Sequence, residues 1–159
     1  MKKLQFHDNK VLKLTNVLKY KLPLNDENFN FNAALQQMQN YIQTNGALPV
    51  GPLIQYTGTR MDSENKMDIE IVMMMQSNHY IDDVKEPYSM ETVIRVPNAL
   101  YCRYMGPKGT MRYAYDKINL EAFESDIQLS NCNYTIFVEE NMEEESMIAD
   151  VFVPREENL

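Results

Sequence analysis

The chain has 159 residues, with 23 acidic side chains against 15 basic ones and a formal charge of −8 at pH 7. This charge disfavours nucleic acid and anionic membrane surfaces as partners, because both bind basic protein surfaces. No apolar run is long enough for a membrane-spanning helix, and the N-terminus lacks the apolar stretch of a signal peptide. Cys102 and Cys132 have no metal-type spacing, so we interpret them as free thiols of a cytoplasmic protein.

The first half of the chain reads as a strand, a helix and two further strands. Residues 11–22 alternate apolar and polar side chains, and Asn16 interrupts this alternation, which predicts a bulge or bend. Apolar residues at helical spacing predict a helix over residues 31–45. Residues 53–57 and 67–75 follow as strands joined by a polar hairpin loop.

The second half repeats this order. Residues 90–96 and 99–105 are expected to form two strands, separated by a proline. A helix is predicted after the next Gly-Pro turn, with an apolar stripe over residues 111–122. Residues 133–138 and 147–153 complete the second copy as strands, with an acidic loop between them.

An internal repeat supports this division into two copies. Residues 11–21 align without gaps onto residues 93–103, at an offset of 82 positions, and the identical pairs are Val11/Val93, Asn16/Asn98 and Leu18/Leu100. Such a repeat indicates two copies of one supersecondary unit, here residues 10–76 and 90–154.

We therefore predict one α+β domain over residues 1–159, built from duplicated β-α-β-β units related by a pseudo-twofold axis. The strands would form an antiparallel sheet with both helices on one side. The groove where the two copies meet is the expected ligand site, because pockets favour such junctions.

Three segments then carry a family resemblance. They are RYMGPKGTMRYAYDKI at residues 103–118, GPLIQYTG at residues 51–58 followed by MDIEIVM, and ADVFVP at residues 149–154. In this order they resemble the GyrI-like family, the small-molecule-binding domain that also serves as the effector-binding module of bacterial multidrug-responsive transcription activators.

The resemblance implies a pseudo-symmetric pair of β-α-β-β units with a central groove lined by aromatic residues. In this family a buried glutamate often meets lipophilic cations there. That glutamate usually lies in a Glu-apolar-Tyr triplet on the strand after the second helix. The matching residues here are Thr135, Ile136 and Phe137, so neither the acid nor the phenol is present at those positions.

Aromatic and acidic side chains on the predicted strands are the candidate ligand contacts. Tyr56 and Phe137 occupy like places in the two copies, 81 positions apart, and would form two walls for a flat ligand; core packing is the alternative. Glu70 and Asp150 lie 80 positions apart, each within an otherwise apolar strand. Such a carboxylate usually lies on the solvated face, and in the groove either would replace the family glutamate. The remaining candidates are Tyr101, Tyr104, Tyr115 and Thr135.

The first functional hypothesis is a stand-alone binding protein for a hydrophobic small molecule, neutral or cationic, with a regulatory or protective role. It needs no cofactor, metal or catalytic residue, and regulation would require a partner protein because we expect no direct contact with nucleic acid. Two alternatives stay open. One is a hydrolase of a reactive small molecule, with Glu70 or Asp150 as the general acid or base. The other is a protein-interaction module, like the gyrase-inhibitor members of the family, whose acidic surface contacts a basic partner.

Overall fold

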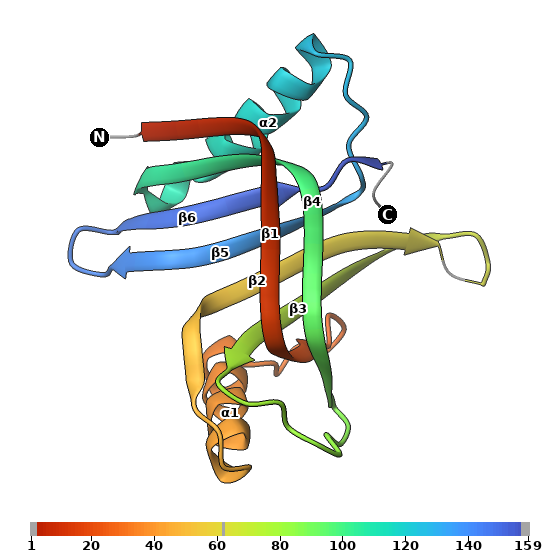
Figure 1. The fold of residues 1–159 in the computed structure, drawn as a ribbon, viewed down its shortest axis with the longest axis vertical. Coiled ribbons are helices and arrows are strands. Elements are labelled where there is room, and N and C mark those ends of the chain that lie inside the picture. The colour runs from red at the N-terminus through yellow and green to blue at the C-terminus, as the bar shows by residue number, and fades with distance from the viewer. Residues whose placement is uncertain (1–2, 62, 157–159) are drawn as a thin grey trace.

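The computed structural model describes residues 3–61 and 63–156. Its elements follow the order strand, helix, strand, strand, twice over (Figure 1). The first copy consists of β1 (Lys3–Lys21), α1 (Phe31–Thr44), β2 (Pro49–Met61) and β3 (Met67–Ser77). The second consists of β4 (Tyr88–Pro107), the short 3-10 helix η1 (Lys108–Thr110), α2 (Arg112–Glu124), β5 (Cys132–Asn141) and β6 (Ser146–Val153). The predicted α+β class and the duplicated unit are thereby confirmed.

The six strands form a closed antiparallel barrel in the order β1-β3-β2-β5-β6-β4. The two long strands β1 and β4 pair from Lys3 opposite Met105 to Tyr20 opposite Tyr88, and so join the copies on one side. On the other side β2 pairs with β5. The two strands expected at residues 90–96 and 99–105 are therefore one continuous strand, β4, whose pairing with β1 extends past the proline.

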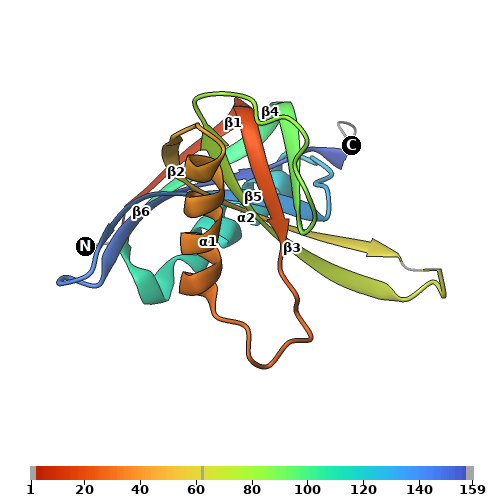
Figure 2. The same cartoon turned by 90° about the horizontal axis from the view of Figure 1, so that it is seen from below.

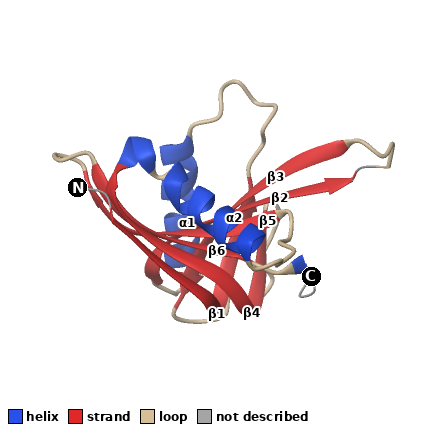
Figure 3. Cartoon of the chain, turned by 90° about the horizontal axis from the view of Figure 1, so that it is seen from above, coloured by secondary structure: helices blue, strands red, loops and turns tan. Residues whose placement is uncertain are grey.

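Alternating side chains along the strands build two kinds of core. One row of every strand points into the barrel, where the apolar interior is formed by Leu12, Leu14, Val17, Ile54, Val72, Met74, Ile94, Val96, Ala99, Tyr101 and Phe152. The other row points outward and is covered by the helices. Helix α1 packs there through Ala34, Met38 and Ile42, and α2 through Ala114, Ile118 and Ala122. Both helices thus lie on one side of the sheet, as predicted (Figure 3).

The repeated asparagines mark the same irregularity in both copies. Asn16 and Asn98 adopt left-handed backbone conformations, with φ angles of 49° and 53°. Asparagine enters this region more readily than most residues with a side chain. After each asparagine the alternation shifts by one residue, so that Leu18 and Leu100 are fully buried on the helix-covered side. The irregularity expected at Asn16 is therefore present, and the repeat has a backbone reason.

Replacing Asn98 by alanine should lower the free energy of unfolding by about 1 kcal/mol, because alanine is strained at a positive φ. Replacing it by glycine should cost less, since glycine adopts this conformation freely. Urea denaturation of the two variants measures the difference. Equal losses for alanine and glycine would show that the side chain of Asn98, rather than its backbone, is what matters.

Candidate ligand-binding site

A pocket of about 250 Å³ lies where strands of the two copies meet. Five strands contribute its lining, which consists of Lys19, Tyr56, Glu70, Val72, Met74, Glu91, Ile94 and Tyr134. Val72, Met74 and Ile94 belong to the buried interior of the barrel, so the pocket has an apolar floor. Its remaining lining is aromatic and charged.

Two tyrosines form an aromatic wall. Tyr56 and Tyr134 face each other across the β2–β5 pair, with ring centroids 5.1 Å apart at an interplanar angle of 58°. The Tyr56 ring lies over Gly58, where a Cβ atom would come within 2.6 Å of the Tyr56 hydroxyl oxygen. Because only glycine leaves this space, Gly58 sets the position of the ring.

Both phenols of this wall are uncharged at neutral pH. Burial raises the pKa of Tyr56, and the neighbouring Cys132 raises it further. Burial also raises the pKa of Tyr134 to about 12, with Cys132 and Glu91 as lesser causes. The two rings therefore offer apolar faces to a ligand, and their hydroxyl groups remain protonated.

The charged groups of the pocket leave one carboxylate without a cation. Lys19 Nζ forms an ion pair with Glu91 Oε1. Among the side chains that the structure describes, none forms an ion pair with the half-buried Glu70. Its negative charge is one of the smaller causes of the raised pKa of Tyr56. The pocket thus combines aromatic faces, an apolar floor and an acid that no described side chain pairs with.

Asp150, the second acidic candidate, is held by its own chain. Its Oδ1 accepts hydrogen bonds from Arg103 Nε at 2.7 Å and from the Tyr101 hydroxyl at 2.8 Å, and its Oδ2 accepts from Arg103 Nη2 at 2.9 Å. Burial, together with Asp150, raises the pKa of Tyr101 to about 12. Tyr101 also packs on Phe152, with ring centroids 4.9 Å apart. Both carboxylate oxygens of Asp150 thus accept hydrogen bonds from Arg103 or Tyr101, and the role of Asp150 is to hold these two side chains in place.

The other four candidates lie in the contact between α2 and the outer side of the sheet, Tyr115 on the helix and Tyr104, Thr135 and Phe137 on the strands. Tyr104 is fully buried, and its hydroxyl donates to the backbone oxygen of Pro107. The hydroxyls of Tyr115 and Thr135 are 2.6 Å apart, and Phe137 packs into the same cluster as α2. The structure therefore brings Tyr56 and Glu70 together in the pocket and places these four residues where they dock the helix.

Strand register also shows which residues of the two copies correspond. In the pairing of β2 with β5, Ile54 lies opposite Ile136 and Tyr56 lies opposite Tyr134. The pseudo-twofold axis exchanges these two pairs, so Ile136 in the second copy corresponds to Tyr56 in the first, at an offset of 80 positions. Phe137 is therefore one residue out of phase and faces the opposite side. The equivalent residues Leu18 and Leu100 lie opposite Met75 of β3 and Val153 of β6. Residues of β3 and β6, the last strands of the two copies, therefore correspond at an offset of 78 positions. The counterpart of Asp150 is consequently Val72, so Asp150 and Glu70 are not equivalent.

Apart from the apolar floor, which was also not predicted, the lining residues that the sequence did not identify as site residues are Lys19, Glu91 and Tyr134. Tyr134 carried a usable signal, because it lies next to Thr135 in an alternating strand and must face the other side. Lys19 and Glu91 meet through the β1–β4 pairing of residues 72 positions apart in sequence, which no local pattern announces.

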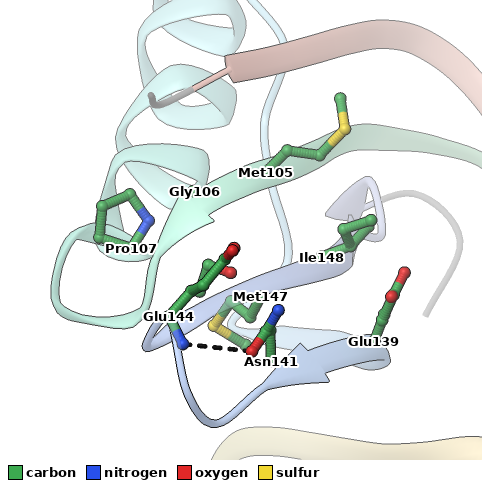
Figure 4. A pocket seen from close by; sticks show the side chains of 9 residues that line it. Met105, Gly106, Pro107, Glu139, Asn141, Glu144, Met147 and Ile148 are labelled. Carbon is green, nitrogen blue, oxygen red and sulfur yellow. Dashed lines mark hydrogen bonds between the residues drawn. The ribbon is translucent and has the colours of Figure 1, made fainter.

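A second hollow, of about 440 Å³, lies between the end of β4 and the β5–β6 hairpin (Figure 4). Met105 and Ile148 give it apolar surface, and the hairpin is closed by a hydrogen bond of 3.1 Å from Glu144 N to Asn141 Oδ1.

No group of three or more metal-ligating side chains occurs within the described part of the chain. Over the same residues, no helix has the length and apolar character needed to cross a membrane.

No family model and no curated protein matches the sequence. The fold, however, is similar to that of solved structures. The EcmrR C-terminal domain aligns with a TM-score of 0.59 at 14% identity, over 98% of this chain and 97% of that domain. The EcmrR chain of the EcmrR–DNA complex in EcmrR-RPo gives the same score and identity, and the present chain spans 57% of its length. SAV2435 bound to tetraphenylphosphonium aligns over 94% of both chains with a TM-score of 0.47 at 10% identity. At these identities the similarity shows the fold alone.

Proposed function

We propose that residues 1–159 form a GyrI-like domain that binds a small hydrophobic cation in the pocket between its two copies. The observation that carries this proposal is the carboxylate of Glu70, which forms no ion pair with any described side chain, beside the Tyr56–Tyr134 ring pair. Aromatic faces attract cations, and a half-buried acid without a partner favours a positive ligand further. Glu70 would take the part that the family assigns to a glutamate on another strand.

The dimensions of the pocket limit the ligand. Its volume of about 250 Å³ is below the roughly 300–1,000 Å³ of pockets for drug-sized ligands. The ligand is then either a small arylammonium-like molecule or one cationic group of a larger molecule that protrudes. In a cytoplasmic setting, binding would serve regulation through a partner protein or sequestration of the compound. The similarity in fold to a domain of the DNA-binding protein EcmrR supports the regulatory role.

The test is a thermal-shift and calorimetric titration with benzyltrimethylammonium, compared with its uncharged isostere neopentylbenzene. A ligand that binds only the folded state must raise the melting temperature. We expect the cation to bind more tightly than the isostere. Replacing Glu70 by glutamine should weaken cation binding about tenfold, which corresponds to about 1.4 kcal/mol, and Tyr134→Ala should weaken it similarly through loss of the ring face.

Glu27→Gln is the matched control, because Glu27 is an exposed acid in the loop before α1, outside the pocket. It should leave the affinity unchanged. Equal affinity of the wild type and Glu70→Gln for the cation would contradict the proposal. Chromatography of the titrated mixture also shows whether the ligand stays intact, as a binding protein requires.

A further inference from the structure

The β2–β3 hairpin projects beyond the barrel (Figure 2). The pairing of β3 with β1 ends where Val72 lies opposite Lys21, followed by one hydrogen bond of 2.8 Å from Leu22 N to Ile71 O. The pairing of β3 with β2, by contrast, continues to Met67 opposite Met61. The segment from Met67 to Ile69 therefore has a strand on one edge only.

The free edge carries backbone groups able to bind another strand. The Ile71 carbonyl points toward β1, as its hydrogen bond shows. Backbone groups of alternate residues point to the same edge in an antiparallel sheet, so those of Ile69 and Met67 point the same way. Within the described residues, neither has a backbone partner on that edge. Exposed edges of this kind are templates for strand addition.

The second copy shows the same edge occupied. Met147 of β6 corresponds to Ile69 at the offset of 78 positions, and there β4 continues with Gly106 opposite Met147 and Pro107 opposite Ser146 (Figure 4). In the first copy β1 ends at Lys21, and the chain turns away at Pro23. The repeat thus contains one covered and one uncovered version of a single strand edge.

The side chains around the uncovered edge indicate what it would accept. A hollow of about 590 Å³ lies between the loop after β1 and the start of β3. Leu24 and Ile69 line it and are 51% and 54% exposed, which gives an apolar floor open to solvent. Asp26 and Asp68 add two carboxylates to the lining and Lys21 adds one ammonium group, so that the lining is negative on balance. The surface therefore favours a partner that alternates apolar and basic side chains.

A second copy of this chain fits the edge poorly. If two such edges paired antiparallel with Asp68 at the centre, Asp68 of one copy would lie opposite Asp68 of the other. With Ile69 at the centre, Asp68 of one copy would lie opposite Glu70 of the other. Like charges directly opposite each other destabilise a strand pair. A basic segment of another protein meets no such repulsion.

We propose that the edge of β3 from Met67 to Ile69 binds an extended segment of a partner protein by strand addition. The partner strand would take the place that Gly106 and Pro107 of β4 occupy in the second copy. Its backbone would pair with Ile69, its apolar side chains would enter the hollow beside Leu24, and its basic side chains would meet Asp26 and Asp68. This site is separate from the pocket at Tyr56 and Glu70.

The test uses a fluorescently labelled, acetylated heptapeptide of alternating lysine and valine, with a peptide of glutamate and valine for comparison. Fluorescence anisotropy should show binding of the basic peptide, weakening with salt because its charge contacts are exposed. Ile69→Pro removes the outward N–H without touching the ladder to β2 and should weaken binding about tenfold or more, whereas Ile69→Ala keeps this group and should weaken it less. Asp68→Lys should shift the preference toward the acidic peptide, and the distant Asp116→Lys should not.

Comparable binding of both peptides, binding of neither, or equal affinities of Ile69→Pro and wild type would overturn the proposal. The melting temperatures of the variants verify that they fold. If Ile69→Pro does not fold, Asp68→Lys still tests the proposal. Sedimentation of the free protein examines the competing occupant: a dimer abolished by Ile69→Pro would show that a second copy fills the edge.

Discussion

Replacing Ile118 by alanine is expected to lower the free energy of unfolding by about 3 kcal/mol, because it removes buried methylene groups and leaves a cavity. Ile118 is fully buried at the centre of the contact between α2 and the outer side of the second copy. The surrounding side chains come from β4, β6 and α2, so several elements would have to move together to close the space. Urea denaturation followed by circular dichroism measures the loss.

Leu120→Ala is the matched control on the same helix. Leu120 is 52% exposed, and its truncation should change the free energy of unfolding by less than about 0.5 kcal/mol. Alanine is the better helix former at both positions, so propensity cannot produce the difference. Similar losses for the two variants would mean that α2 does not dock on the sheet through the Ile118 side.

Replacing Asp150 by alanine is expected to cost about 2 kcal/mol. The change leaves the guanidinium of Arg103 and the hydroxyl of Tyr101 without their acceptor, and breaking a buried ion pair by removing one partner costs about 3–5 kcal/mol. We place the value below that range because the Arg103 side chain is 36% exposed, so that water solvates part of the orphaned charge. Thermal and urea denaturation give the loss.

A double-mutant cycle separates the ion pair from the packing. Arg103→Met combined with Asp150→Leu should be less destabilised than the sum of the single variants, because no unpaired charge remains. Cation binding at the Glu70 pocket should be unchanged in the double variant. Additive losses would show that the two residues do not act as a pair, and loss of cation binding would place Asp150 in the ligand site.

The sequence predicted the duplicated unit well because its signals are local. Apolar residues at positions 34, 38 and 42, and at 114, 118 and 122, form the buried stripes of both helices. The identical pair Asn16 and Asn98 marks the left-handed residue that each long strand requires. Even the burial of Leu18 and Leu100 follows from their identical place in the repeat.

The candidate site was harder to predict because it depends on register between distant strands. On sequence alone, Phe137 was matched to Tyr56 at an offset of 81 positions and Asp150 to Glu70 at an offset of 80. The offset in fact falls from 82 to 80 to 78 positions along the copies, because the connections differ in length. An error of one residue reverses the face of a side chain, whereas an error of two preserves the face and moves the residue along the strand.

Periodicity within a few turns or residues is enough to predict the β-α-β-β order, its repetition and the helix-covered face. The closure of the barrel and the choice of carboxylate depend instead on contacts between distant strands. Asp150 and Glu70 look alike in sequence, yet pairing of β4 with β6 brings Arg103 to Asp150, while no described side chain forms an ion pair with Glu70. Whether an acid forms an ion pair depends on the strand that lies beside it, and strand neighbours are set by contacts between residues far apart in the chain.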